Sequence, residues 1–290
     1  MAGIAPGFGG LRVLALESRR APEIATLIRN SGGEPLVAPA LREVPLESNA
    51  EALAFAESLQ RGEVDVVIFL TGVGTRALVS VVEHAGSRES FLAALRRAKV
   101  VARGPKPMAA LREVDVPVWL AVPEPNTWRE LLAALDAKAS EQPLAGARVA
   151  VQEYGISNAD LLDGLRTRGA QVTRVPVYRW ALPEDIEPLK AAVNAVARGE
   201  VDLVMFTTGM QVVHLLQVAQ DMHLHAAVLT SLTRMVIASI GPTTSEELQR
   251  HGLAADMEPS HPKMGFLVRE AAERAGELLR AKRSSEYPDR

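Results

Sequence analysis

The sequence predicts an α/β protein built as two similar lobes, each a parallel sheet flanked by helices. The strongest observation is an internal duplication. Residues 62–72 read GEVDVVIFLTG and residues 199–209 read GEVDLVMFTTG, with eight of eleven positions identical at an offset of 137. Self-similarity at a fixed offset indicates two copies of one structural unit. Two further observations agree: apolar runs alternate with segments of helical periodicity, and each copy has one extended, proline-containing segment at an equivalent place.

The duplication extends along nearly the whole chain. Gly104-Pro105 recurs as Gly241-Pro242, again at an offset of 137. A molecule of two lobes has a natural cleft between its halves, and ligands favour such domain interfaces. A ligand site between the lobes is therefore expected. Two further pairs recur at an offset of 136, Arg12 with Arg148 and Glu17 with Glu153.

Short apolar runs bounded by polar residues predict the buried strands. LRVLAL at 11–16 and VDVVIFL at 64–70 are examples, and neither alternates strictly with polar residues. Apolar strands separated by helices are typical of parallel sheets covered on both faces. The expected strands are 11–16, 64–70, 98–102 and 118–122 in the first copy, and 147–152, 201–206, 235–240 and 254–257 in the second.

The segments between these strands show the helical spacing of Ala and Leu. Positions 53, 56 and 59–60, for example, return to one face every three or four residues. Such amphipathic helices would cover the two faces of each sheet. The expected helices are 21–31, 49–60, 74–84, 106–113 and 127–138, then 157–168, 184–198, 210–220, 243–251 and 264–282.

Two extended segments, 36–46 and 173–183, leave the order of the lobes open. Their prolines forbid helix continuation and bias the preceding residues to extended geometry. If both segments are ordinary loops, the lobes follow one another along the chain. If both are linkers, the opening strand and helix of each copy belong to the other lobe. The residue pattern by itself favours the serial arrangement.

Composition restricts the class of protein. Hydrophobic residues make up 48% and charged residues 23% of 290, as in ordinary globular proteins of two domains. A net charge of −3 provides no broad basic field, so a nucleic-acid partner is not expected. No apolar run approaches the roughly 20 residues of a membrane-spanning helix, so a membrane partner is not expected either.

The chain ends and the missing cysteines bear on location. The start, MAGIAPGFGG, lacks the features of a signal peptide and is interpreted as a flexible lead-in. The polar residues 283–290 are expected to be disordered. The chain has no cysteine, which suits a cytoplasmic protein, and this location is expected.

Thr71-Gly72 and Thr208-Gly209 are the first candidate site residues. Each pair ends the most apolar strand of its copy and opens a helix. A threonine there can cap free backbone N–H groups, and those groups can also bind an anion. Since open α/β sheets bind ligands at the carboxyl ends of their strands, both a structural cap and a ligand contact are considered.

Gly104 and Gly241 occupy a second equivalent place, after a strand and before a helix. Glycine allows close approach of the backbone to a partner, and the proline that follows presets the first helical turn. Thr243 and Thr244 follow in the second copy and could cap or bind, whereas the first copy has Lys106-Pro107. The difference favours the second copy as the functional one.

Two other kinds of site were weighed. Residues 72–77, GVGTRA, match the G-x-G-x-x-A pattern of dinucleotide-binding proteins, but they follow a later strand, and Gln211 replaces the second glycine in the other copy. The histidines at 214, 223 and 225 lack a carboxylate-rich surrounding, so no metal site is expected.

Tyr178, one of three tyrosines, could offer its phenol to a cleft or serve packing.

Together these residues resemble the uroporphyrinogen-III synthase family over roughly 11–275. No single motif is strong, but their order and spacing with the duplication are specific. The features that carry the resemblance are Arg19, Gly33, Pro39, VPVYRW at 175–180, FTTGMQVV at 206–213 and IGPTTSEEL at 240–248.

The resemblance implies a fold in which the copies exchange their openings. Residues 1–39 would join 183–290 in one lobe, residues 46–173 would form the other, and 40–45 would pair with 174–182 as a two-stranded extended hinge. This corrects the serial arrangement that the residue pattern favours.

The resemblance also implies an activity without a cofactor. A monomeric lyase would cyclise hydroxymethylbilane, a linear tetrapyrrole with many carboxylates, to uroporphyrinogen III with inversion of ring D and loss of water. Tyr178 would be the general acid, and Arg19, Thr208 and Thr244 would contact the substrate. Met210 and Pro107 depart from the family pattern, so no hydroxyl contact is carried over to either. The alternatives are a non-enzymatic two-lobed protein that binds a small polyanion and a nucleotide-dependent oxidoreductase.

Overall fold

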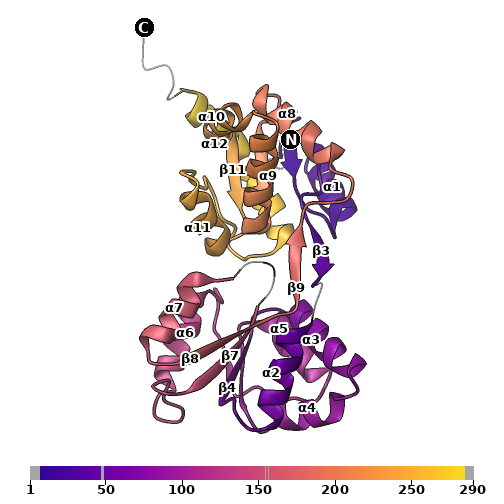
Figure 1. Ribbon diagram of the computed structural model, residues 1–290. Coiled ribbons are helices and arrows are strands. Elements are labelled where there is room, and N and C mark those ends of the chain that lie inside the picture. The colour runs from indigo at the N-terminus through magenta and orange to yellow at the C-terminus, as the bar shows by residue number, and fades with distance from the viewer. Residues whose placement is uncertain (1–6, 47–48, 154, 156, 285–290) are drawn as a thin grey trace. The chain divides into compact units, whose positions relative to one another are not determined.

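The computed structural model describes residues 7–46, 49–153, 155 and 157–284, which form two compact units. Unit 1 consists of Met1–Arg42 and Ala181–Arg290, and unit 2 of Glu43–Trp180. Each unit has its own parallel sheet between two layers of helices (Figure 1). This confirms the predicted fold class.

The sheet of unit 1 has four parallel strands in the order β11-β10-β1-β2. One face packs on α1 and α12, and the other on α8, α9 and α10 with part of α11. The strands are β1 (Arg12–Ala15), β2 (Glu34–Val37), β10 (Leu203–Phe206) and β11 (Val236–Ser239). The helices are α1 (Ala21–Asn30), α8 (Glu187–Ala197), α9 (Gly209–Asp221), α10 (His225–Arg234), α11 (Pro242–Arg250) and α12 (Met264–Ser284).

The sheet of unit 2 has five parallel strands in the order β6-β5-β4-β7-β8. One face packs on α2, α3 and α4 with part of α5, and the other on α6 and α7. The strands are β4 (Val66–Phe69), β5 (Lys99–Ala102), β6 (Leu120–Ala121), β7 (Arg148–Glu153) and β8 (Gln171–Pro176). The helices are α2 (Ala50–Gln60), α3 (Gly72–His84), α4 (Arg88–Leu95), α5 (Pro105–Arg112), α6 (Trp128–Ala137) and α7 (Ala159–Thr167).

The central strands are buried on both faces. Along β4, Val67 and Phe69 join the cluster under α2, α3 and α4, whereas Val66 and Ile68 join the cluster under α6 and α7. All four side chains have no exposed surface. This two-sided burial explains why the strand is apolar throughout rather than alternating.

The first strand of each copy lies in the sheet of the other copy. β1 pairs with β10, with Val13 opposite Leu203, and β7 pairs with β4, with Val149 opposite Val66. The serial arrangement is therefore wrong. Sequence periodicity shows that a segment is a buried strand, but it does not show which strand lies beside it.

The duplicated GEVD motif helps to hold the exchanged strand. Asp65, just before β4, accepts the backbone N–H of Arg148 at 2.8 Å and its guanidinium at 2.6 and 3.0 Å. Asp202, just before β10, accepts the backbone N–H of Arg12 at 2.9 Å. In both units an aspartate of one copy thus binds the arginine that opens a strand of the other copy.

The two chain crossings between the units run through a separate pair of strands. β3 (Arg42–Pro45) and β9 (Tyr178–Ala181) form a two-stranded sheet, and both unit boundaries fall within these strands. They correspond to the extended, proline-containing segments of the sequence.

Several sequence expectations need correction. Helices α4 and α10, which begin 137 residues apart at Arg88 and His225, were not expected. The expected strand 254–257 is reduced to one bridge between Ala238 and Met257. Phe8 is 2% exposed and packs in the core of unit 1, so this part of the expected flexible lead-in is wrong.

The ends of the chain are partly outside the description. Arg283 and Ser284 belong to α12, contrary to the disorder expected for 283–290, and 285–290 lie outside the described residues. Within the part of the chain that the structure describes, no helix combines the length and apolar character needed to cross a membrane.

We expect Asp65→Asn to lower the free energy of unfolding by about 1–2 kcal/mol at pH 7, since it weakens charge-assisted hydrogen bonds to Arg148 at a partly exposed site. Hydrogen bonding to the Arg148 guanidinium holds the pKa of Asp65 below its ordinary value. Its stabilisation is therefore present at neutral pH and is lost as the pH falls through that lowered pKa.

Urea unfolding at pH 7 and at about pH 3 measures this difference, which should shrink in acid. The matched control is Glu113→Gln, which removes an exposed pair with Arg76 and should change little. An equal effect of Asp65→Asn at both pH values would contradict the assignment.

Candidate functional site

Each sheet has one place where the strand order reverses. In unit 1 the chain leaves β1 for α1 on one face and leaves the neighbouring β10 for α9 on the other face. In unit 2 the neighbours β7 and β4 lead in the same way to α7 and α3. The carboxyl ends of such a strand pair form the usual ligand site of an open α/β sheet.

A hydrogen-bond network joins the two strand ends of unit 1. The hydroxyl of Thr207, after β10, donates to Oε2 of Glu17, after β1, at 2.7 Å. Gln211, in the first turn of α9, donates from Nε2 to the carbonyl of Leu16 at 3.1 Å and to the Thr207 hydroxyl at 2.9 Å. Its Oε1 accepts the Thr207 N–H at 2.7 Å. The start of α9 is therefore bound directly to the end of β1.

Unit 2 also has a glutamine between strand and helix, but this glutamine lies on the strand rather than on the helix. The position equivalent to Gln211 is Gly74, in the first turn of α3, and a Cβ there would overlap the side-chain amide of Gln152. Gln152 lies on β7 at the place of Leu16, is fully buried, and donates from Nε2 to the Glu153 carbonyl at 2.5 Å. A glutamine thus fills the space between strand and helix in both units, from the helix in one and from the strand in the other.

The position of Gln152 in unit 2 helps to account for the glycine pattern of residues 72–77. Gly74 makes room for Gln152, and a Cβ on Gly72 would lie 2.6 Å from the carbonyl oxygen of Lys106 in α5. Both glycines are required by close packing within unit 2. The dinucleotide-binding pattern therefore has a structural explanation.

The two threonines that open α3 and α9 differ in their hydrogen bonds. Thr71 caps α3, because its hydroxyl accepts the N–H of Gly74 at 3.1 Å. Thr208 has the same extended backbone, but its hydroxyl caps nothing in α9. Thr71 therefore has a structural role, whereas the Thr208 side chain stays available to a ligand, as do the first N–H groups of α9, which have no intrahelical acceptor.

Gly104 opens α5, which lies beside α3 in unit 2, and Gly241 opens α11, which lies beside α9 in unit 1. Gly104 is extended, and a Cβ there would lie 3.0 Å from the side chain of Asn126. With its amide oriented to donate, Asn126 bridges the carbonyls of Arg103 and Val122 at 2.9 Å each. Gly241 is also extended and packs beside Pro262.

The hydroxyl residues that open α11 point in different directions. Thr243 is exposed, whereas Thr244 is 3% exposed and belongs to the interior of unit 1. The hydroxyl of Ser245, the next residue, lies 2.9 Å from the Ser239 hydroxyl and 2.5 Å from Oε1 of Glu258, which share its one hydrogen. Of the predicted contacts at this helix start, Thr243 is the one whose side chain is open to solvent.

Tyr178 and Arg19 occupy contrasting places. Tyr178 begins β9, is 7% exposed, and meets Trp180 edge-to-face with the ring centroids 5.6 Å apart. It belongs to the apolar cluster of unit 2, so the structure shows its packing role. Arg19 is exposed in the loop between β1 and α1 of unit 1.

No residue group described by the structure resembles a metal site. Among the described residues, no three His, Asp or Glu side chains gather in a way that could hold a metal ion. His214 is buried in α9 with Nδ1 2.6 Å from the Ala40 carbonyl, and burial lowers its pKa. His214 therefore serves as a neutral internal hydrogen-bonding group.

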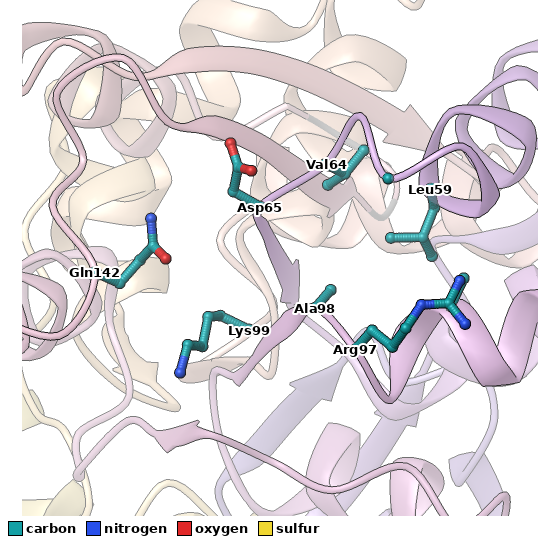
Figure 2. A pocket seen from close by; sticks show the side chains of 9 residues that line it. Leu59, Val64, Asp65, Arg97, Ala98, Lys99 and Gln142 are labelled. Atoms are coloured by element: carbon teal, nitrogen blue, oxygen red, sulfur yellow. The ribbon is translucent and has the colours of Figure 1, made fainter.

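A pocket of about 280 Å³ lies at the opposite edge of the unit 2 sheet (Figure 2). Asp65 and Lys99, at the amino ends of β4 and β5, line it together with Arg97 and Gln142. The Asp65 carboxylate is already bound by Arg148. None of the predicted site residues lines this pocket, so it is separate from the carboxyl-end residues.

These observations define a two-unit α/β protein with a switch point at the carboxyl ends of the strands in each unit. The family model described as uroporphyrinogen-III synthase HemD matches residues 22–269. The chain belongs to the uroporphyrinogen-III synthase family, and it is an enzyme of the cyclising lyase type.

Individual relatives agree with this membership. A crystal structure of a mutant uroporphyrinogen III synthase from Thermus thermophilus is 28% identical, with a TM-score of 0.71 over 92% of this chain and 99% of that one. A Methanothermobacter thermautotrophicus protein provisionally named as a uroporphyrinogen-III synthase is 31% identical over 81% of this chain and 87% of its own length. The uncharacterised Bacillus subtilis protein YjjA is 31% identical over 92% of this chain and 96% of its own.

Sequence reasoning missed three polar residues at the strand ends: Glu17, Gln152 and Gln211 as a hydrogen-bonding residue. The recurrence of Glu17 as Glu153 was a usable signal. The exchange between Gln211 and Gln152 was not visible, because it depends on which strand lies beside which helix.

We expect Gly74→Gln to destabilise the protein by at least about 2 kcal/mol, since the new side chain would compete with Gln152 for one buried space. Adding Gln152→Leu copies the arrangement of Gln211 and Leu16, and it should recover most of the loss. Chemical unfolding of the two single variants and the double variant measures the coupling, expected above about 1 kcal/mol.

The control is Gly276→Gln on α12, where a Cβ would meet nothing within 4 Å. This change should not reduce stability, because glycine is a poor helix former. Strictly additive effects of Gly74→Gln and Gln152→Leu would show that the two positions do not share one space.

Proposed function

We propose that this protein converts hydroxymethylbilane to uroporphyrinogen III with inversion of ring D and loss of water. Family membership is the observation that carries the proposal. The starts of α3, α5, α9 and α11 support it, because in both units a pair of helices begins after a strand and would offer main-chain N–H groups to an anion. A protein of net charge −3 has no bulk attraction for a polycarboxylate, so such local donors would have to bind it.

The proposed substrate contacts follow from the placement of each residue. Thr208 and Thr243 would donate from their hydroxyl groups, and Arg19, an exposed residue, would donate from its guanidinium. Gly72, Gly104, Gly209 and Gly241 would contribute through the main chain at the helix starts. Thr71 would act by capping α3, and Thr244 by packing behind the first turn of α11.

The proposed reaction begins when the hydroxymethyl group of ring A loses its oxygen. The C–O bond breaks, its electron pair leaves with the oxygen, and a proton completes a water molecule. Tyr178 is proposed as the group that donates this proton, since a phenol O–H is a donor. The remaining azafulvene cation bonds to the substituted α-carbon of ring D to give a spiro intermediate. The older bond from that carbon to the ring C bridge then breaks, the other α-carbon of ring D bonds to the bridge carbon, and ring D is thereby inverted. The proton that this second α-carbon loses restores the pyrrole and the general acid.

Positioning would supply most of the specificity. Hydroxymethylbilane closes without an enzyme, but to the type I isomer. The protein must therefore favour the geometry of the spiro intermediate over direct closure, which requires the substrate to be held at several points. No cofactor enters this scheme, and the cytoplasmic location and monomeric state stay predictions.

Isomer analysis tests the proposal directly. Purified protein is supplied with hydroxymethylbilane at neutral pH, and the products are oxidised to porphyrins and separated by isomer. We expect type III to dominate, whereas heat-denatured protein should leave type I. Exclusive formation of type I by the folded protein would overturn the proposed function.

The two helix-opening threonines provide a matched pair of variants. Thr71→Val should lower the free energy of unfolding by about 1 kcal/mol, because it removes the cap of α3. Thr208→Val should leave stability unchanged, because its hydroxyl caps nothing. It should raise the KM for hydroxymethylbilane several-fold, because this hydroxyl is proposed to donate to the substrate. Thermal unfolding and steady-state kinetics measure both effects, and a stability loss in Thr208→Val without a change in KM would refute the assignment.

A further inference from the structure

An acidic side chain lies where an acidic substrate is proposed to bind. Glu17 follows β1 directly and is half-buried at the switch point of unit 1. Its Oε2 accepts the Thr207 hydroxyl at 2.7 Å, and its Oε1 accepts the backbone N–H of Arg20 at 3.3 Å. These bonds hold the carboxylate beside the start of α9, where Thr208 and Gly209 are proposed to bind carboxylates.

The equivalent glutamate of unit 2 has a different environment. Glu153, at an offset of 136, is 4% exposed and accepts the Ser157 hydroxyl at 2.6 Å. Its charge is balanced by Arg174, whose Nε lies 2.8 Å from Oε2. Glu153 therefore has the surroundings of a structural ion pair.

Glu17 has no comparable ion pair. Its two donors are a hydroxyl and a backbone N–H, and the nearby Arg20 guanidinium binds Glu23. The Arg20 guanidinium attracts the Glu17 carboxylate only at longer range, since its hydrogen bonds go to Glu23, and the described residues form no closer ion pair with Glu17. A fixed carboxylate of this kind favours positive charge and N–H donors in its surroundings.

The proposed reaction creates such a positive charge. When the ring A hydroxyl leaves as water, the methylene carbon and its pyrrole share one unit of positive charge, and the pyrrole N–H becomes a stronger donor. The carboxylates of the substrate are anions, so they need N–H donors rather than a negative partner, and helix N-termini would bind them. The strand edge of unit 1 thus has separate groups for the anionic and the cationic parts of one molecule.

We propose that Glu17 is a catalytic residue whose carboxylate accepts a pyrrole N–H and stabilises the azafulvene cation. This inference rests on the proposed function. Glu17 neither gives nor receives a proton in this step, since the leaving oxygen takes its proton from the general acid. Its interaction is strongest after the C–O bond begins to break, so it should lower the barrier rather than strengthen binding of the starting substrate.

Glu17→Gln provides the main test, because glutamine keeps the size and the acceptor for Thr207 but removes the charge. We expect kcat for hydroxymethylbilane to fall about 10- to 100-fold, with KM unchanged or lower and the unfolding temperature preserved. Glu17→Asp keeps the charge. On a logarithmic scale its kcat should lie closer to that of wild type than to that of Glu17→Gln. The charge-matched control is Glu187→Gln on α8, whose side chain is 74% exposed, and its kcat should equal that of wild type.

The outcomes separate this inference from the proposed function. Wild-type protein that forms no type III product would overturn the proposed function itself. Wild-type turnover with an unchanged kcat in Glu17→Gln would overturn the role of Glu17 alone. If Glu17→Gln does not fold, the aspartate variant decides, and a folded Glu17→Asp with a kcat loss above 100-fold would show that the charge is not what matters.

Discussion

The structure depends on the exchange of the first strand between the two copies. Without β1, the sheet of unit 1 would lose its contact between β10 and β2, and β7 has the same place between β4 and β8. The aspartate of each GEVD motif binds the arginine that opens the exchanged strand. The most similar segment of the two copies is therefore the one that holds each copy to the other.

This strand exchange also creates the switch point of each sheet, which is the candidate ligand site. Because an exchanged strand lies beside the central strand of the other copy, the chain leaves the two carboxyl ends toward opposite faces of the sheet. Polar residues then join the two ends, through Gln211 in unit 1 and Gln152 in unit 2. The duplication preserved the geometry of the switch points, while the side chains diverged, and Glu17 and Glu153 are the clearest example.

The sequence predicted the helices and strands better than it predicted which strands pair and which residues form long-range hydrogen bonds. Continuous apolar runs such as 64–70 predicted the buried strands, because a strand covered on both faces needs apolar residues throughout. Helix α4 was missed although Phe91 and Leu95 are buried at helical spacing, since only eight residues show the pattern. The exchange came from the family resemblance, and the hydrogen bonds of Glu17 depend on Thr207, a residue 190 positions away.

Main-chain donors at the carboxyl ends of the strands are proposed to hold the acidic tetrapyrrole. A crystal structure with uroporphyrinogen III bound tests this most directly. We expect substrate-derived carboxylates within hydrogen-bond distance of the N–H groups that open α9 or α3, at Gly209 or Gly72. A macrocycle seated instead at the amino ends of β4 and β5, beside Arg97 and Lys99, would contradict it.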